Sequence, residues 1–207
     1  MPTLLIASRN AHKAEEIGAI LGDGFTVQTL AAFSDAPPVI EDGDSFAANA
    51  TKKSREIAAW LENQALGQAL PDFVLADDSG LEVYALDGAP GIHSARYASG
   101  ENEGNAADAD NNAKLLRELA TVPASDRGAQ FRCVLALTAL GQTYKTELFE
   151  GICRGQISQA ESGDGGFGYD PLFIPDGFTQ SFAELGAATK NTLSHRAKAL
   201  AKLAAFF

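Results

Sequence analysis

Short apolar runs alternate along this chain with segments whose apolar residues recur at the spacing of a helix, and this alternation limits the folds open to it. The chain opens with an apolar run at residues 4–7. Ile17, Ile20 and Leu21 then share one helix face before Gly22 ends the pattern. This order predicts a strand, a loop and a helix. Repeated along the chain together with hairpins, it predicts an α/β fold with a mixed central β-sheet flanked by helices.

The middle of the chain continues the alternation. Ser45 is expected to cap a second helix that runs to about Leu61. The apolar run 73–76 predicts a strand. Residues 77–80 are Asp-Asp-Ser-Gly, which are turn-forming types, so the strand is expected to end there and a second strand to follow over residues 81–85.

The second half contains one long polar stretch and a predicted hairpin. Residues 99–110 are rich in Gly and Asn and are interpreted as a loop, the one weak candidate for a domain boundary. The alternation from Phe131 to Leu137 predicts a strand that pairs with residues 143–150, and a last helix is expected from about Ser194. No repeat or low-complexity linker divides the chain. Residues 1–207 are therefore interpreted as a single domain, with room for two closely packed lobes.

Charge and cysteine content exclude several classes of function. The chain has 27 acidic and 16 basic residues, and its formal net charge of −11 disfavours binding to nucleic acid backbones or anionic membranes. No apolar run approaches the length of a membrane span and the first residues lack a signal-peptide pattern, so we expect a cytoplasmic protein. Cys133 and Cys153 lie in predicted strands and are expected to be reduced thiols.

Paired carboxylates are the first candidate for chemistry. Asp77 and Asp78 follow an apolar strand, a position from which carboxylates can hold a hard cation, although the same residue types also favour a plain surface turn. Glu41 precedes a Gly-containing bend and by itself reads as a solvated loop acid. If the fold brings Glu41 and Asp78 together, two carboxylates and substrate phosphate oxygens form the kind of site that Mg²⁺ occupies.

Two segments offer cations for phosphate groups. Ser8, Asn10 and Lys13 place a hydroxyl, an amide and an ammonium at a helix start, where free backbone N–H groups favour an anion. The alternative is a helix cap with a solvated lysine, and the glycines of a Walker loop are absent. Lys53 shares one helix face with Asn49 and Glu56, and that polar face belongs either to solvent or to a site.

Residues 166–171, Gly-Phe-Gly-Tyr-Asp-Pro, hold two aromatic rings among glycines. Such a loop can present Phe167 and Tyr169 to a base for stacking, or it can be an aromatic-anchored surface loop. Ser194-His195-Arg196 places donors at a helix start, where Arg196 can bind a keto oxygen, unless Ser194 is a cap and the other two face water. The three histidines lack zinc-site spacing.

Taken together, these motifs resemble one family, the inosine triphosphate pyrophosphatases or Ham1-like proteins, over nearly the whole chain. Two departures from the family pattern are Arg9, where a small residue is frequent, and Ala48, where glutamate is frequent. The resemblance rests on the following residues and segments in their order: Ser8, Asn10 and Lys13; Glu41, Phe46, Asn49, Ala50 and Lys53; and 76–81, 88–97, 166–171 and 194–196.

The resemblance implies hydrolysis of the α–β phosphate bond of ITP, dITP and XTP to the monophosphate and pyrophosphate. It implies Mg²⁺ as cofactor, a homodimer, and an elongated two-lobed fold shared with the Maf-like proteins. Catalytic roles fall to Lys13, Lys53 and Asp78, with Glu41 and Asp78 as metal ligands and either Asp77 or Asp78 as the base that deprotonates water. The implied substrate-binding residues are Ser8, Arg9, Asn10, Ala11, His12, Lys13, Ser79, Phe167, Gly168, Tyr169, Asp170, Lys190, His195 and Arg196.

Base selectivity follows from donor and acceptor patterns. Hypoxanthine and xanthine present an O6 acceptor where adenine presents an amino donor, so a fixed donor such as Arg196 rejects adenine. Guanine shares O6, and its exclusion needs a site that leaves its 2-amino group unpaired. Two other interpretations stay open: a Maf-like pyrophosphatase, whose expected Ser-x-Ser-x-x-Arg loop differs from residues 8–13, and a sensor that binds nucleotide without turnover.

Overall fold

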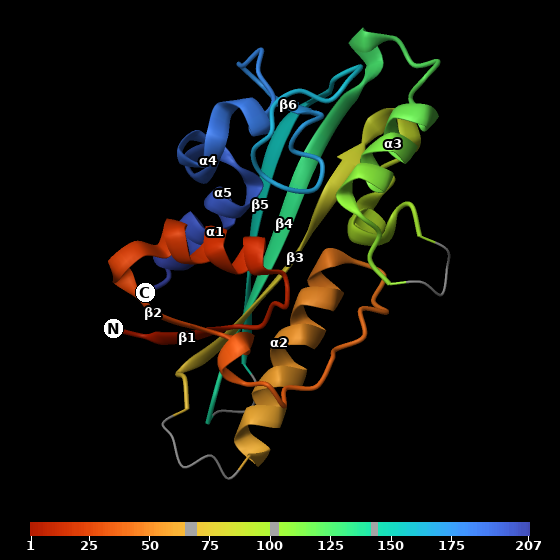
Figure 1. The fold of residues 1–207 in the computed structure, drawn as a ribbon. Coiled ribbons are helices and arrows are strands. Elements are labelled where there is room, and N and C mark those ends of the chain that lie inside the picture. Colours follow the sequence, from red (N-terminus) through yellow and green to blue (C-terminus); the bar gives the residue numbers. More distant parts are fainter. Residues whose placement is uncertain (65–69, 100–103, 142–144) are drawn as a thin grey trace. The chain divides into compact units, whose positions relative to one another are not determined.

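The computed structural model describes residues 1–64, 70–99, 104–141 and 145–207. It has an α/β fold, as predicted, and Figure 1 labels its helices and strands. The strands are β1 (Thr3–Ile6), β2 (Thr26–Thr29), β3 (Phe73–Val83), β4 (Gly128–Ala139), β5 (Thr146–Ile157) and β6 (Phe173–Pro175). The helices are α1 (Ala11–Leu21), α2 (Phe46–Asn63), α3 (Asp108–Glu118), α4 (Phe182–Leu193) and α5 (His195–Ala204).

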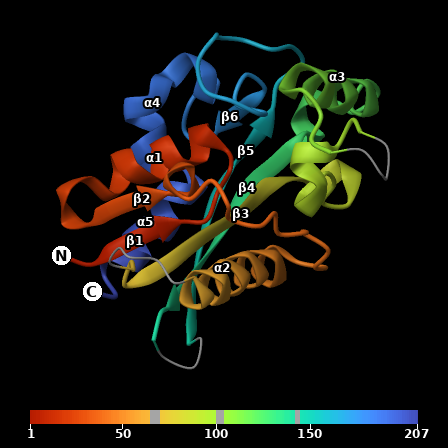
Figure 2. The same cartoon turned by 60° about the horizontal axis from the view of Figure 1, so that its bottom comes forward.

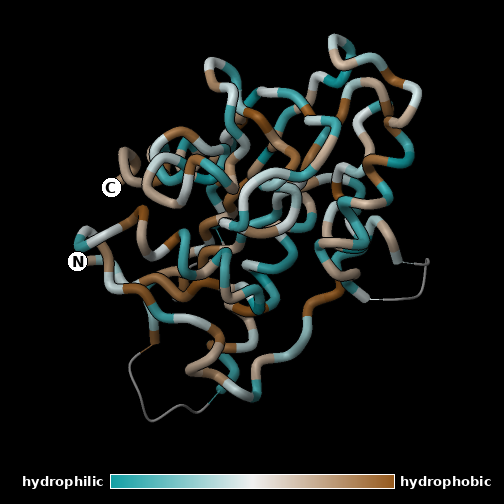
Figure 3. Tube along the Cα trace, turned by 45° about the horizontal axis from the view of Figure 1, so that its top comes forward, coloured by the Kyte–Doolittle hydropathy of each residue, from teal (hydrophilic) through white to brown (hydrophobic). Residues whose placement is uncertain are grey.

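The six strands form one mixed sheet in the order β2-β1-β3-β4-β5-β6. β1 is parallel to both β2 and β3, whereas β5 and β6 are antiparallel. The parallel pairs follow from helical crossovers such as α1 between β1 and β2. Figure 3 shows hydrophobic and hydrophilic residues alternating at short intervals along the trace, the pattern from which these elements were predicted.

The chain divides into two compact units. The first contains Met1–Asp78, Cys133–Gly151 and Ala199–Phe207, and the second contains Ser79–Arg132 and Ile152–Lys198. The first division falls inside β3, between the consecutive residues Asp78 and Ser79.

The strands of the first unit bury side chains on both faces. Leu4 and Ile6 of β1 pack with Ile17 of α1, while Leu5 packs with Ile57 of α2 and with Val74 of β3. Successive residues of a strand point to opposite faces, so α1 covers one face and α2 the other. Figure 2 shows α1 and α2 on the two sides of β1 and β3.

The second unit has a core of its own. Leu81 and Val83 of β3 pack with Phe131 of β4, with Leu115 of α3 and with Phe182 of α4. The rings of Phe131, Phe173 and Phe182 lie against one another, with a centroid distance of 4.7 Å between Phe131 and Phe173 and of 5.3 Å between Phe173 and Phe182.

Several predicted boundaries are confirmed. The side chain of Asn10 caps α1, and Gly22 ends it with a positive φ of 54°. Ser45 caps α2, and α5 begins directly after Ser194. The predicted hairpin corresponds to the neighbouring strands β4 and β5. Residues 142–144 between these strands in the sequence, and 100–103 of the predicted loop, lie outside the described residues. Helix α4 was not predicted from the sequence. Within the described residues, no helix is both long and apolar enough to cross a membrane.

One prediction is wrong: residues 77–80 are not a turn. β3 is a single strand of 11 residues from Phe73 to Val83, and the Asp-Asp-Ser-Gly segment lies in its middle. The local preference of these residues for turns is overridden because Asp77 and Asp78 both find partners on the two faces of the sheet.

Candidate active site

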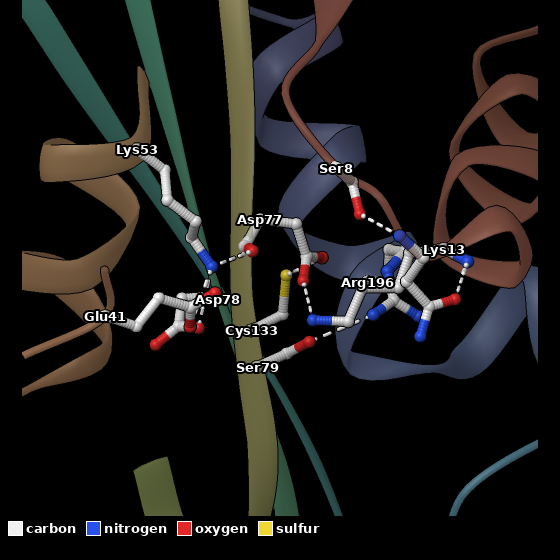
Figure 4. A network of polar contacts seen from close by, with 10 residues as sticks. Ser8, Lys13, Glu41, Lys53, Asp77, Asp78, Ser79, Cys133 and Arg196 are labelled. Atoms are coloured by element: carbon white, nitrogen blue, oxygen red, sulfur yellow. Dashed lines mark hydrogen bonds and ion pairs between the residues drawn. The ribbon is translucent and has the colours of Figure 1, made fainter. Parts of the chain in front are cut away.

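The alternation of side chains along β3 sends its two adjacent carboxylates in opposite directions. Asp77 points to the face covered by α1, and Asp78 points to the face covered by α2. Figure 4 shows Asp77 directed at Lys13 on one side of the strand and Asp78 at Lys53 on the other. Both residues are buried, with whole-residue exposed fractions of 2% for Asp77 and 5% for Asp78. Each therefore has its own electrostatic environment.

Asp77 is engaged through both carboxylate oxygens. The ammonium of Lys13 lies 2.8 Å from Oδ1, and the thiol of Cys133 donates to Oδ2 at 3.2 Å. The Lys13 side chain is 18% exposed, whereas that of Asp77 is fully buried. Asp77 thus holds a lysine at the start of α1, and its oxygens are already occupied by donors.

Lys13 lies in the segment 8–13 that was predicted to cradle phosphate, and the structure places it in the first turn of α1. Asn10 Oδ1 accepts a hydrogen bond from the backbone N–H of Lys13 at 3.1 Å, and Ser8 Oγ accepts one from the N–H of Asn10 at 3.2 Å. Asn10 is therefore a helix cap, but Lys13 is not the solvated lysine of that alternative, because it is paired with Asp77. A capped start is compatible with anion binding because it still carries the positive end of the helix dipole. Arg9, Ala11 and His12 in this loop are exposed.

Arg9 departs from the usual family residue, and its guanidinium donates to the carbonyl of Ala36 at 2.5 Å. It therefore ties the loop 8–13 to a neighbouring segment of the first unit. The second departure, Ala48, lies in the first turn of α2, where its N–H donates to the cap Ser45 at 3.3 Å.

Gly43 packs closely against the start of α2. A larger side chain at Gly43 would collide with Ala48 and with Asn49, whose side-chain oxygen accepts a hydrogen bond from the Gly43 N–H at 2.8 Å.

Lys53 joins the two carboxylates that were predicted to bind metal. Its ammonium lies 2.9 Å from Asp78 Oδ1, 3.2 Å from Glu41 Oε2 and 2.8 Å from the backbone carbonyl oxygen of Asp77. Burial alone would lower the pKa of Lys53, but Asp78 and Glu41 outweigh it, so this pKa is raised and the ammonium stays charged. The sequence left open whether this face of α2 belongs to solvent or to a site, and the structure places Lys53 against carboxylates.

The two carboxylates respond differently to this environment. Burial opposes the ionisation of Glu41, but the charge of Lys53 prevails and lowers its pKa. For Asp78 burial prevails over the attraction of Lys53 and Lys13, and it raises the pKa from 3.8 to about 6. Asp78 is thus a carboxylate that can take up a proton near neutral pH.

The donor set fits a hard cation such as Mg²⁺. Oδ2 of Asp78 is buried and meets no hydrogen-bond donor among the described residues, so an oxygen ligand is available beside Glu41. Across the described parts of the chain, no group of three His, Cys, Asp or Glu residues is arranged to hold a metal alone. A pair of carboxylates matches Mg²⁺, which usually keeps several waters and takes its remaining ligands from substrate phosphates.

The predicted base-binding residues lie in the second unit, around the ring of Phe167. The ammonium of Lys190 lies 4.4 Å from the centroid of this ring, and the guanidinium carbon of Arg196 lies 5.9 Å from it. Lys190 is buried and forms an ion pair of 2.6 Å with Asp170, whose Oδ2 also accepts the N–H of Phe167 at 2.9 Å. The family resemblance assigns Lys190 to the polyphosphate together with Lys13 and Lys53. The structure instead groups Lys190 with the base-side residues, in a different unit from those two lysines.

Arg196 and His195 lie at the start of α5, and both are buried rather than facing water. The guanidinium of Arg196 donates to the hydroxyl of Ser79 at 3.0 Å, and the imidazole of His195 stacks on Phe131 at 4.7 Å. Ser194 does act as a cap, since its hydroxyl accepts the N–H of Ala197 at 3.2 Å.

Tyr169 has a different environment from its neighbour Phe167. It is 4% exposed, belongs to the core of the second unit, and donates its hydroxyl to the carbonyl of Ser94 at 2.9 Å. Ser94 in turn accepts the N–H of Leu81 in β3 at 2.9 Å and donates to Gly91 at 2.6 Å. The segment 88–97 carried the family resemblance but had no chemical role assigned to it. It supports the loop 166–171 through the hydrogen bond between Ser94 and Tyr169.

In each unit, residues that the sequence did not single out for chemistry contact the candidate residues. Cys133 contacts Asp77, and Asp108 and Asn112 of α3 contact the backbone of Gly168. A signal was present for Cys133, because its alternation with Phe131, Leu135 and Leu137 puts it on one defined face of β4. No sequence signal marked Asp108 or Asn112, because an acid at a helix start and an asparagine within a helix are both common on protein surfaces.

Comparison with known proteins gives one consistent result. The family model described as "Ham1 family" matches residues 4–206. A dITP/XTP pyrophosphatase of Geobacter sulfurreducens is 49% identical over 204 residues, which cover 98% of this chain and 95% of the relative. A second dITP/XTP pyrophosphatase, from Shouchella clausii, is 43% identical over 203 residues, covering 98% and 95% of the two chains.

Solved structures agree with these relatives. The Ham1 protein of Staphylococcus aureus has a TM-score of 0.80 and 37% sequence identity, and the alignment covers 99% of this chain and 97% of that one. A HAM1 protein from Coxiella burnetii has a TM-score of 0.81 at 36% identity, with coverage of 100% and 98%.

Proposed function

We propose that this chain, which belongs to the Ham1 family, is a nucleoside-triphosphate pyrophosphatase that hydrolyses ITP, dITP and XTP to the monophosphate and pyrophosphate. The observation that carries the proposal is the pair Asp77 and Asp78 on opposite faces of β3, each with its own buried or half-buried lysine. One carboxylate holds a phosphate-binding cation, and the other has a raised pKa and an open oxygen. The relatives that match the chain at 43% and 49% identity are named dITP/XTP pyrophosphatases, and that name covers two of the three proposed substrates.

The reaction requires a cation for the polyphosphate and a base for water. Lys13, held by Asp77, and the N-terminal amides of α1 bind phosphate oxygens and offset their charge, which lets a nucleophile approach. Asp78 accepts a proton from the attacking water, the new bond forms between the water oxygen and phosphorus, and the α–β bridging bond breaks so that pyrophosphate leaves. Between Asp77 and Asp78, we assign the base role to Asp78, because both oxygens of Asp77 already accept from Lys13 and Cys133.

Glu41 and Asp78 are the residues that would hold Mg²⁺. When bound, the ion neutralises charge on the phosphates and lowers the pKa of a coordinated water. Lys53 keeps the two carboxylates in place through its contacts with both.

Base recognition is assigned to the second unit. Phe167 provides a ring for stacking and Arg196 a donor that cannot be deprotonated, which suits O6 of hypoxanthine or xanthine and opposes the amino group of adenine. Asp170 and Lys190 fix the Phe167 loop by their ion pair. We further propose that the active enzyme is a homodimer in the cytoplasm, with purine nucleoside triphosphates as its small-molecule partners.

The test is a panel of ITP, dITP, XTP, GTP and ATP scored for pyrophosphate release with Mg²⁺. We expect release from the first three, loss of activity with a chelator, and its return when Mg²⁺ is added. Asp78→Asn should remove most turnover while keeping the fold, because the amide keeps the shape and removes the charge. Tight binding of ITP without pyrophosphate release would support the sensor interpretation, and release from a different set of nucleotides would support a Maf-like one.

A further inference from the structure

Both backbone polar groups of one glycine in the base-side loop are bound by side chains of α3. The N–H of Gly168 donates to Asp108 Oδ2 at 2.7 Å, and the Gly168 carbonyl accepts from the side-chain amide of Asn112 at 3.1 Å. Gly168 has a positive φ of 62°, a conformation in which neither group joins a regular ladder. Asp108 and Asn112 therefore supply the hydrogen-bond partners of the Gly168 backbone.

The spacing of the two side chains explains why one helix can make both contacts. Asp108 and Asn112 are four residues apart, so they lie one above the other on the same face of α3. That helix is fixed in turn, because the neighbouring Asn111 accepts the N–H of Ala98 at 2.8 Å and donates to the carbonyl of Ala95 at 3.3 Å. The loop is thus attached to a helix that has hydrogen bonds of its own to a further segment of the second unit.

We propose that Asp108 and Asn112 are positioning residues for substrate recognition, which fix Gly168 so that the adjacent ring of Phe167 is held ready to stack on the base. The inference rests on the proposed function and adds to it a part of the chain that contains no catalytic group. Asp170 holds the N–H of Phe167 from the other side at 2.9 Å, so the ring lies between two fixed backbone points. Fixing the ring before binding lowers the ordering cost of base stacking.

The burial of the two residues sets the order of their effects. Asn112 is 2% exposed, whereas Asp108 is exposed, so water replaces the contact of Asp108 more readily. We expect Asn112→Leu to raise KM for ITP about tenfold and Asp108→Ala about threefold, with kcat changed by less than about twofold in both. Asp108→Asn keeps an acceptor oxygen and should restore most of the KM. Asp110→Asn, an exposed change on the same helix, is the matched control and should leave KM unchanged.

A substrate without a base separates positioning from general damage. Inorganic tripolyphosphate shares the phosphates of ITP but cannot stack on Phe167, so its hydrolysis should be the same in wild type, Asn112→Leu and Asp108→Ala. A double-mutant cycle adds a second criterion: in the Phe167→Ala background, Asp108→Ala should have no further effect on KM for ITP. Equal losses for ITP and tripolyphosphate, or additive losses in the cycle, would overturn the proposal.

A measurement without substrate keeps the inference independent of the proposed activity. Amide hydrogen exchange at Gly168, followed by NMR in the full chain, should become at least several-fold faster in Asp108→Ala and stay unchanged in Asp110→Asn. If wild type fails to hydrolyse ITP although Gly168 exchange responds as expected, the proposed function is wrong and the attachment of Gly168 to α3 stands. If ITP is hydrolysed but neither KM nor Gly168 exchange responds to Asp108→Ala, the positioning role is wrong.

Discussion

Substituting the two adjacent aspartates of β3 by asparagine, one at a time, should change stability in opposite directions. Asp78 has a pKa of about 6 in the folded protein against 3.8 for its ordinary value. Between these pH values the folded protein keeps a proton that the unfolded chain has released. The free energy of unfolding therefore falls as pH rises through this window, by about 3 kcal/mol for a shift of about two pH units.

The two variants test this argument directly. Asp78→Asn removes the charge that burial disfavours, so at pH 8 it should be more stable than wild type by about 1–3 kcal/mol, less than the full amount because the amide must still be buried. Asp77→Asn removes the charge that pairs with Lys13 and leaves one acceptor oxygen where Lys13 and Cys133 need two, so it should be less stable than wild type by about 1–3 kcal/mol. At pH 4 the advantage of Asp78→Asn should disappear, because Asp78 is then protonated in the folded wild type.

The assay is urea denaturation at pH 4 and pH 8 with a chelator present, so that no divalent ion binds the carboxylates. Trp60, the single tryptophan, lies in the same unit as Asp77 and Asp78 and packs on Phe33, so its fluorescence reports on that unit. A lower stability of Asp78→Asn than of wild type at pH 8 would refute the reasoning. So would equal effects of the two substitutions.

The remaining predictions concern phosphate binding, base selection and the core. Lys13→Ala should weaken turnover of ITP and XTP by a similar factor, because it contacts the phosphates that both share, and a changed base preference would contradict its assignment. Arg196→Ala should reduce kcat/KM for ITP far more than for ATP. Phe167→Ala should reduce kcat/KM for every purine, because it removes a stacking free energy of about 1–3 kcal/mol that does not depend on the base. An unchanged ITP/ATP ratio in Arg196→Ala would place selectivity elsewhere. Arg127→Met should cost about 3 kcal/mol in urea denaturation, because the buried guanidinium donates to three backbone carbonyls at 2.7–3.1 Å. The exposed Arg154→Ala should change stability by less than about 0.5 kcal/mol.

The sequence predicted elements well where one local pattern determines them. The helix starts at Asn10 and Ser45 depend on a side chain that caps its own helix, so the information is contained within a few residues. The middle of β3 could not be predicted in this way. Its residues 77–80 favour a turn locally, but they are extended. Asp77 and Asp78 find hydrogen-bond donors on α1, α2 and β4, and these donors lie as far as 64 positions away in the chain.

The candidate site shows the same division. Lys13, Lys53, Glu41 and Asp78 were selected from motifs. The metal hypothesis required Glu41 and Asp78 to lie together, and in the structure both contact the ammonium of Lys53. One partner of the adjacent Asp77 could not be selected. Nothing in the neighbourhood of Cys133 in the sequence indicates that its thiol meets a carboxylate 56 positions away.

Adjacency of Asp77 and Asp78 in a strand is itself a means of separating two chemical roles. Carboxylates two residues apart would share a face and repel each other, whereas neighbours lie on opposite faces and each takes a lysine from a different helix. Asp77 meets two donors and serves to hold Lys13, while Asp78 is buried with one oxygen open and its pKa near neutral. When the environments of two titratable groups differ in this way, the group with the raised pKa is the better acid or base. The folded protein is therefore expected to lose stability when Asp78 is ionised. That loss is the free-energy cost of keeping a buried base in the site before substrate binds.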